Sequence, residues 1–257
     1  MFIHLALMGL VGWLLVAEPL LGRRASLRLG QALDRGEADA RTRFLLAWTW
    51  QGWALVAATM AITLGLAGWS PAQLGLAWPR DTAGVNIGTL LGLGGAMLAG
   101  AATAVIGARI AARRHGNRTS TAPATAAILR MLPRTRRERL AFAALAVTAG
   151  IGEEIVWRGF GLGVMHAWLP QAHPVLWVLL LAVAFGWAHL YQGRAGVIGT
   201  SVIGGVLAAI YVATKSLLIP IVLHVLIDLR ALLIPVPPDQ GSMPTAAVPE
   251  TSTREVV

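Results

Sequence analysis

The sequence predicts an all-α fold: a polytopic transmembrane helical bundle of about seven spans. Three observations predict it. Of the 257 residues, 56% are hydrophobic and only 13% are charged, which is about half the charged fraction of a soluble domain. Apolar runs of roughly 18 residues or more recur along the chain, and each can cross a bilayer core of about 30 Å. The runs are continuous rather than alternating, which argues against a closed β-barrel.

The apolar runs set the expected elements in order. The first is expected to be a transmembrane helix because it lacks the basic start and the cleavage site of a signal peptide. The spans are predicted near residues 2–22, 44–68, 84–112, 139–165, 174–190, 196–214 and 217–235. The chain then divides into N-terminal transmembrane helices (1–112), a basic cytoplasmic loop (113–138), a transmembrane core (139–235) and a tail (236–257). The tail is rich in Pro, Ser and Thr and is expected to be disordered.

The net charge of +9 comes mainly from Arg residues in short connections between spans. Connections 23–43 and 113–138 are Arg-rich, whereas in the loop 69–83 Arg80 is balanced by Asp81. Positive loops stay in the cytoplasm, so this alternation predicts an outer N-terminus and a cytoplasmic C-terminus. The charge is therefore explained by membrane orientation, and no nucleic-acid partner is expected. The absence of Cys excludes disulfides, thiolate metal ligands and Cys catalysis.

Ionisable residues inside a bilayer are costly, so each one needs a reason. In the first half, Glu18 and Arg109 lie near the ends of expected spans. The second half concentrates such residues in three clusters on separate spans: Glu153, Glu154 and Arg158; His189 behind Phe185; and His224 with Asp228. Their coincidence in one region of the chain indicates a functional site.

Helical spacing gives these clusters a geometry. Glu154 and Arg158 are i,i+4 and can pair on one face. Glu153 is rotated by about 100° from Glu154 and is free to point into a cavity. His224 and Asp228 are also i,i+4, so Asp228 can orient the imidazole and fix its tautomer. We expect one free carboxylate and two imidazoles to face a common water-filled pocket.

Simpler interpretations of the same residues remain open. The Glu–Arg pair can be a buried structural pair, the histidines can be packing residues or an interhelical clamp, and Phe185 can be ordinary packing. A proton-coupled transporter also uses buried Glu and His, so residue types alone leave an enzyme and a transporter open. Transporters are usually built from internal repeats, and the sequence shows none.

The three clusters read EExxxR over residues 153–158, FxxxH over 185–189 and HxxxD over 224–228. In this order on successive spans they resemble the signature of the CPBP family, also called the Abi or type II CAAX prenyl endopeptidase family. The resemblance covers roughly residues 135–235. It implies an α-helical membrane endopeptidase fold, with a CAAX-protease-like core in the last four spans and glutamate-dependent hydrolysis of peptide bonds.

The resemblance also implies roles for the six residues. Glu153 would be the general base that activates water, and His189 would hold that water or stabilise charge. His224 and Asp228 would face the developing oxyanion, while Glu154 and Arg158 would brace the site. Where eukaryotic members have Asn, this chain has Asp228, as many bacterial relatives do. An ionised Asp donates no hydrogen bond, so Asp228 would act either protonated or by orienting His224.

A cofactor is judged from the same residues. Glu153, His189 and His224 form a His₂Glu set, which catalytic zinc sites allow. The HExxH spacing is missing, however, and a cofactor-free mechanism is favoured over a zinc-dependent one.

The expected partners are membrane lipids and a peptide or protein substrate reached from the membrane or cytoplasmic side. The Ala- and Arg-rich composition points to a bacterial inner or plasma membrane. The alternative function is a non-proteolytic membrane protein on the same scaffold, acting in bacteriocin immunity or as a chaperone-like partner.

Overall fold

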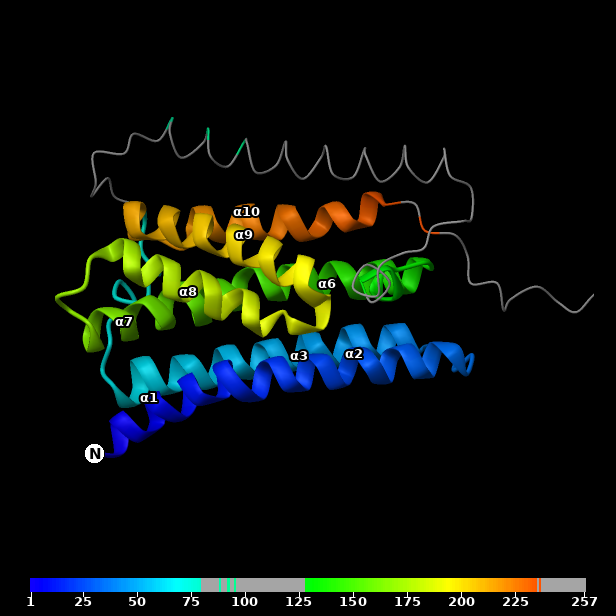
Figure 1. Ribbon diagram of the computed structural model, residues 1–257, viewed down its shortest axis with the longest axis horizontal. Helices are drawn as coiled ribbons and strands as arrows, with labels where there is room; N and C mark the ends of the chain where they lie inside the picture. The colour runs from blue at the N-terminus through cyan, green and yellow to red at the C-terminus, as the bar shows by residue number, and fades with distance from the viewer. Residues whose placement is uncertain (80–87, 89–91, 93–94, 96–127, 235, 237–257) are drawn as a thin grey trace, which may run out of the picture.

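The computed structural model describes residues 1–79, 88, 92, 95, 128–234 and 236, and across them the chain is helical without a strand. The long helices run roughly along one axis and form a bundle (Figure 1). This confirms the predicted all-α fold for the described part. The expected span 84–112 and the expected tail 236–257 fall almost wholly outside the described residues. The domain boundaries remain predictions.

The first two long helices form a hairpin, and its first helix is longer than the apolar run in the sequence indicated. Helices α1 (Phe2–Gly12) and α2 (Glu18–Asp34) are joined through a π-helix, η1 (Trp13–Ala17), into one helix of 33 residues. Helix α3 (Ala40–Met60) and the π-helix η2 (Ala61–Leu66) then return.

The prediction of a loop over 23–43 was therefore wrong. Arg23, Arg24 and Arg28 lie on α2, and the connection covers only residues 35–39. Arg is a good helix former, so the helix continues beyond the bilayer segment that an apolar run detects.

The second half begins with α6 (Arg136–Glu153), and a capping box at Thr135 stabilises the start of this helix. The Thr135 hydroxyl accepts a hydrogen bond from the Glu138 amide, and the Glu138 carboxylate accepts one from the Thr135 amide. The elements that follow are η3 (Glu154–Gly161, a π-helix), α7 (Leu162–Trp168), α8 (Pro174–Ala188), η4 (Leu190–Gln192), α9 (Gly193–Thr214), α10 (Leu218–Leu229) and η5 (Arg230–Leu233).

Four helices of the described part are long and apolar enough to cross a membrane. They cover Phe2–Asp34, Ala40–Leu66, Arg136–Trp168 and Leu190–Thr214. Helices α8 and α10, with 15 and 12 residues, would be about 22 Å and 18 Å long, shorter than a bilayer core of about 30 Å. They occupy the expected spans 174–190 and 217–235, and polar site residues lie at or near their C-terminal ends.

Ion pairs join several elements at one end of the bundle. Arg41 pairs with Glu138 at 2.8 Å, and Arg130 pairs with Asp34 at 2.9 Å. Arg139 donates to the Leu232 carbonyl at 3.1 Å. The α2–α3 connection, the start of α6 and the end of α10 therefore meet at one end (Figure 1). The two Arg-rich connections were expected on one side of the membrane; which side they face remains a prediction.

Two glycines allow the helices that carry the polar clusters to approach closely. A Cβ on Gly186 of α8 would lie 2.6 Å from the Val197 carbonyl oxygen of α9, and one on Gly150 of α6 would lie 2.8 Å from the Val225 nitrogen of α10. Small residues at such contacts permit tight helix packing in membranes. The glycines thus help to place α6, α8 and α10 around one site.

Candidate active site

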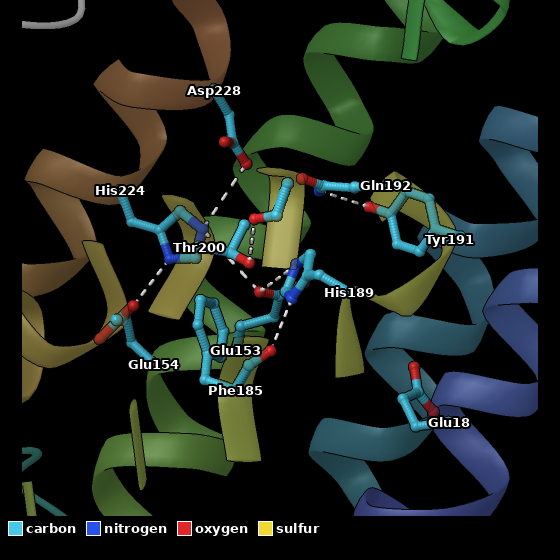
Figure 2. A network of polar contacts seen from close by, with 12 residues as sticks. Glu18, Glu153, Glu154, Phe185, His189, Tyr191, Gln192, Thr200, His224 and Asp228 are labelled. Atoms are coloured by element: carbon cyan, nitrogen blue, oxygen red, sulfur yellow. Dashed lines mark hydrogen bonds and ion pairs between the residues drawn. The ribbon is translucent and has the colours of Figure 1, made fainter. Parts of the chain in front are cut away.

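The six residues expected from the sequence come together in three dimensions (Figure 2). Glu153 ends α6, Glu154 and Arg158 lie on η3, His189 caps α8, and His224 and Asp228 lie on α10. Glu153, His189, His224 and Asp228 line a cavity of about 390 Å³. Glu154 and Arg158 are fully buried behind it. Their shared location follows the expectation of a common pocket, whereas their catalytic roles remain a proposal.

The Glu154–Arg158 ion pair anchors the site. Arg158 Nη1 lies 2.9 Å from Glu154 Oε1, and both side chains are 0% exposed. Arg158 Nη2 donates to the Gly204 carbonyl of α9 at 3.1 Å, and its guanidinium lies 4.3 Å from the centre of the Phe185 ring on α8. A buried ion pair is tolerated when further hydrogen bonds satisfy its polar atoms, and here they satisfy part of them, because Glu154 Oε2 and Arg158 Nε have no partner within the described residues. The predicted pair is present, and it ties η3 to α8 and α9.

His224 is oriented by Glu154, not by Asp228. Its Nδ1 lies 2.7 Å from Glu154 Oε1, while its Nε2 lies 3.7 Å from Asp228 Oδ2. A carboxylate only accepts hydrogen bonds, so Nδ1 carries the proton of this bond. The structure thus gives Glu154 the contact expected of Asp228. Local spacing could not show this, because the two partners are 70 positions apart.

His189 is fixed by the carbonyl of Phe185, one turn earlier. Its Nδ1 lies 2.8 Å from that oxygen, and since a carbonyl only accepts, Nδ1 is the donor. The Phe185 ring lies 4.7 Å from the His189 ring and 6.1 Å from the His224 ring, centre to centre. Phe185 therefore does more than ordinary packing, because it separates and supports both imidazoles and Arg158.

Glu153 completes the arrangement. Its Oε2 lies 3.8 Å from His189 Nε2 and 3.8 Å from His224 Nε2. This oxygen is buried and has no hydrogen-bond partner within the described residues, although the whole side chain is 32% exposed. These separations are too long for direct hydrogen bonds and leave a position at which one water can contact the carboxylate and an imidazole.

The zinc alternative concerns Glu153, His189 and His224. Within the described ranges, no group of three or more His, Asp or Glu residues that could hold a metal ion is found. The cofactor-free mechanism remains a prediction.

The sequence interpretation missed cavity residues from the first hairpin. Glu18 on α2 and Gln51 on α3 line the same cavity as Glu153, and so does Tyr191, whose ring lies 5.8 Å from the His189 ring. Glu18 was placed near a span end, but because the helix continues to Asp34 it lies near the middle. The sequence feature that could have identified Glu18 as a cavity residue is its acidic side chain inside an apolar helix.

Comparison with known proteins supports one family. Residues 135–230 match the family model described as type II CAAX prenyl endopeptidase Rce1-like. No curated protein and no solved structure matches the chain. The match spans α6 to α10 and includes all six site residues. Together with the four apolar helices it indicates an integral membrane protein and supports a membrane-embedded protease of the CAAX type. The match covers less than half of the chain, and over residues 135–230 the protein is similar to the type II CAAX prenyl endopeptidase Rce1-like family.

Proposed function

We propose that this protein is an intramembrane endopeptidase in which Glu153 activates water. The observation that carries the proposal is the unpartnered Glu153 Oε2, which faces Nε2 of His189 and of His224 at 3.8 Å. A general base needs a carboxylate within hydrogen-bond reach of the attacking water. The proposed position of this water lies between Glu153 Oε2 and the Nε2 atoms of His189 and His224.

The proposed reaction has two proton movements. Glu153 takes a proton from water as the water oxygen attacks the carbonyl carbon of the peptide bond. The C–N bond of the resulting tetrahedral intermediate then breaks, and the proton on Glu153 passes to the leaving nitrogen. The products are one new carboxyl terminus and one new amino terminus, without a metal or a covalent intermediate.

His224 and His189 are proposed to stabilise this intermediate. Glu154 holds His224 through Nδ1 and leaves Nε2 directed at the cavity. When protonated, Nε2 can donate to the oxyanion, as preorganised donors do in other hydrolases. Because Nδ1 of His189 donates to the Phe185 carbonyl, Nε2 of the neutral ring can accept a hydrogen bond from the attacking water. Asp228, 3.7 Å from His224 Nε2, supports the charged imidazole electrostatically.

The proposed substrate is a peptide or a protein tail that enters from the membrane or cytoplasmic side. Apolar side chains from α3 and α6, including Phe44, Leu45, Trp48 and Phe142, line the cavity beside the polar site. Such a wall suits an extended apolar segment. We also propose a bacterial inner or plasma membrane location, with the N-terminus outside.

The proposal is tested by replacing Glu153 with Gln. Wild-type and variant membranes are compared by mass spectrometry of peptide products. The expected result is a loss of product of at least about 100-fold with normal insertion, since general-base catalysis contributes at least that much. Glu37→Gln is the control, because Glu37 pairs with Arg35 and Arg43 in an exposed connection. Undiminished product from Glu153→Gln would contradict the mechanism, and inhibition by a chelator would restore the zinc alternative.

A further inference from the structure

Glu18 is a carboxylate inside the first long helix, and no cationic side chain pairs with it among the residues that the structure describes. Its oxygens accept hydrogen bonds from Gln51 Nε2 at 3.2 and 3.0 Å and from Trp13 Nε1 at 3.1 Å. Both donors are neutral. None of the ion pairs within the described part of the chain includes Glu18. Acidic side chains on membrane-spanning helices usually face a cavity and mark a path for a substrate or ion.

Glu18 belongs to the wall of the catalytic cavity. Glu18 and Gln51 line this cavity together with Glu153 and His189. One turn after Glu18, Gly22 lies against Tyr191, whose Cδ1 would be 3.4 Å from a Cβ at that position. The Tyr191 ring lies 5.8 Å from the His189 ring. Helix α2, which carries Glu18, is thus packed against the residue beside the active site.

The charges of this wall favour a cationic occupant. Among the described residues that line the cavity, Glu18, Glu153 and Asp228 are acidic, and Arg230 is the one cationic residue apart from the two histidines. The buried pair of Glu154 and Arg158 is neutral as a unit and lies outside the lining. Trp13 and Gln51 orient the Glu18 carboxylate but leave its charge and some of its lone pairs unused. In a site of low dielectric constant, such a charge attracts a cation strongly.

We propose that Glu18 is a specificity-determining residue that binds a Lys or Arg side chain of the substrate. Gln51 positions the carboxylate for this contact. The inference rests on the proposed endopeptidase function and names its substrate class: segments with a basic residue near the bond to be cut. An endopeptidase cuts within a chain, so the side chain rather than the terminal amine supplies the cation.

The test measures binding rather than cleavage. The probes are short dye-labelled Ala/Leu peptides, N-acetylated and C-amidated, each with a single Lys at a successive position. Matched probes carry uncharged norleucine instead. Fluorescence anisotropy is measured on the full-length protein in lipid nanodiscs. At the position that reaches Glu18, the wild type is expected to prefer Lys by about tenfold or more, which is typical of a hydrogen bond to a charged group.

Two variants separate the charge of Glu18 from its position. Glu18→Gln keeps the shape of the side chain and should reduce the Lys preference to about one. Gln51→Leu keeps the charge but removes the positioning donor and should weaken the preference severalfold, so the test does not depend on one variant folding. Glu37→Gln, an exposed carboxylate at the end of the hairpin, should leave the preference unchanged.

The outcomes are separable from those of the proposed function. An equal Lys preference in wild type and Glu18→Gln, or no preference at any position, would overturn the inference even if Glu153 proves catalytic. A preference that appears only when the probe has a free amino terminus would assign Glu18 to a terminal amine and overturn the side-chain proposal. If Glu153 proves not to be the catalytic base, the expected ratio of Lys to norleucine affinity is unchanged.

Discussion

The two halves of the molecule hold their ionisable residues in different ways. In the first hairpin, α1 to α3, the ion pairs of Asp34 and Arg41 lie at one end of the bundle and join the hairpin to the start of α6. In α6 to α10, the six site residues lie within the bundle, where hydrogen bonds of 2.9 and 2.7 Å connect Arg158 to Glu154 and Glu154 to His224. A buried network of this kind makes each member depend on the others. The second half therefore holds the proposed catalytic residues, while the hairpin supplies a wall of the cavity.

The largest expected effect comes from breaking the buried pair. Arg158→Ala leaves the Glu154 carboxylate at 0% exposure without its guanidinium partner, and breaking a buried ion pair in this way costs about 3–5 kcal/mol. Arg137→Ala is the matched control, because its pair with Asp39 is largely exposed and should change stability by less than about 1 kcal/mol. Unfolding in detergent with increasing denaturant measures both. Equal losses of unfolding free energy in the two variants would contradict the proposed difference between buried and exposed ion pairs.

A smaller effect is expected where helices of the second half touch. Gly186→Ala would place a Cβ 2.6 Å from the Val197 carbonyl oxygen, and overpacking of this kind costs about 1–3 kcal/mol. Gly199→Ala on α9 meets nothing within 4 Å and should be neutral or stabilising by up to about 1 kcal/mol, because Ala favours helix more than Gly. The same unfolding assay checks both variants. If Gly199→Ala is the more harmful, the close contact is not what positions α8.

The smallest expected effect concerns Asp228. Its oxygen lies 3.7 Å from His224 Nε2, beyond hydrogen-bond distance, while Glu154 orients the ring. Asp228→Asn should therefore keep kcat/KM within about tenfold of wild type, since only a distant charge is removed. Glu154→Gln, which weakens the 2.7 Å contact to His224, should lower it further. The reverse order in peptide-cleavage kinetics would return the orienting role to Asp228.

The sequence predicted much of this site because part of its geometry is local. The i,i+4 spacing predicted the Glu154–Arg158 pair, and apolar runs predicted where most of the helices of the second half lie. The His224–Glu154 contact could not be predicted, because it depends on how α10 packs against η3. Glu18 was missed for a related reason: the apolar run ended at residue 22, whereas the helix continues to Asp34 and packs against η4.

The central claim is that Glu153 supplies chemistry while Glu18 supplies selectivity, although both carboxylates line one cavity. The most direct measurement is the rate of peptide cleavage by membranes containing wild type or Glu153→Gln, with products identified by mass spectrometry. The predicted result is a fall of at least about 100-fold for Glu153→Gln in a protein that inserts and unfolds normally. Cleavage of the same bonds at an undiminished rate would contradict the claim.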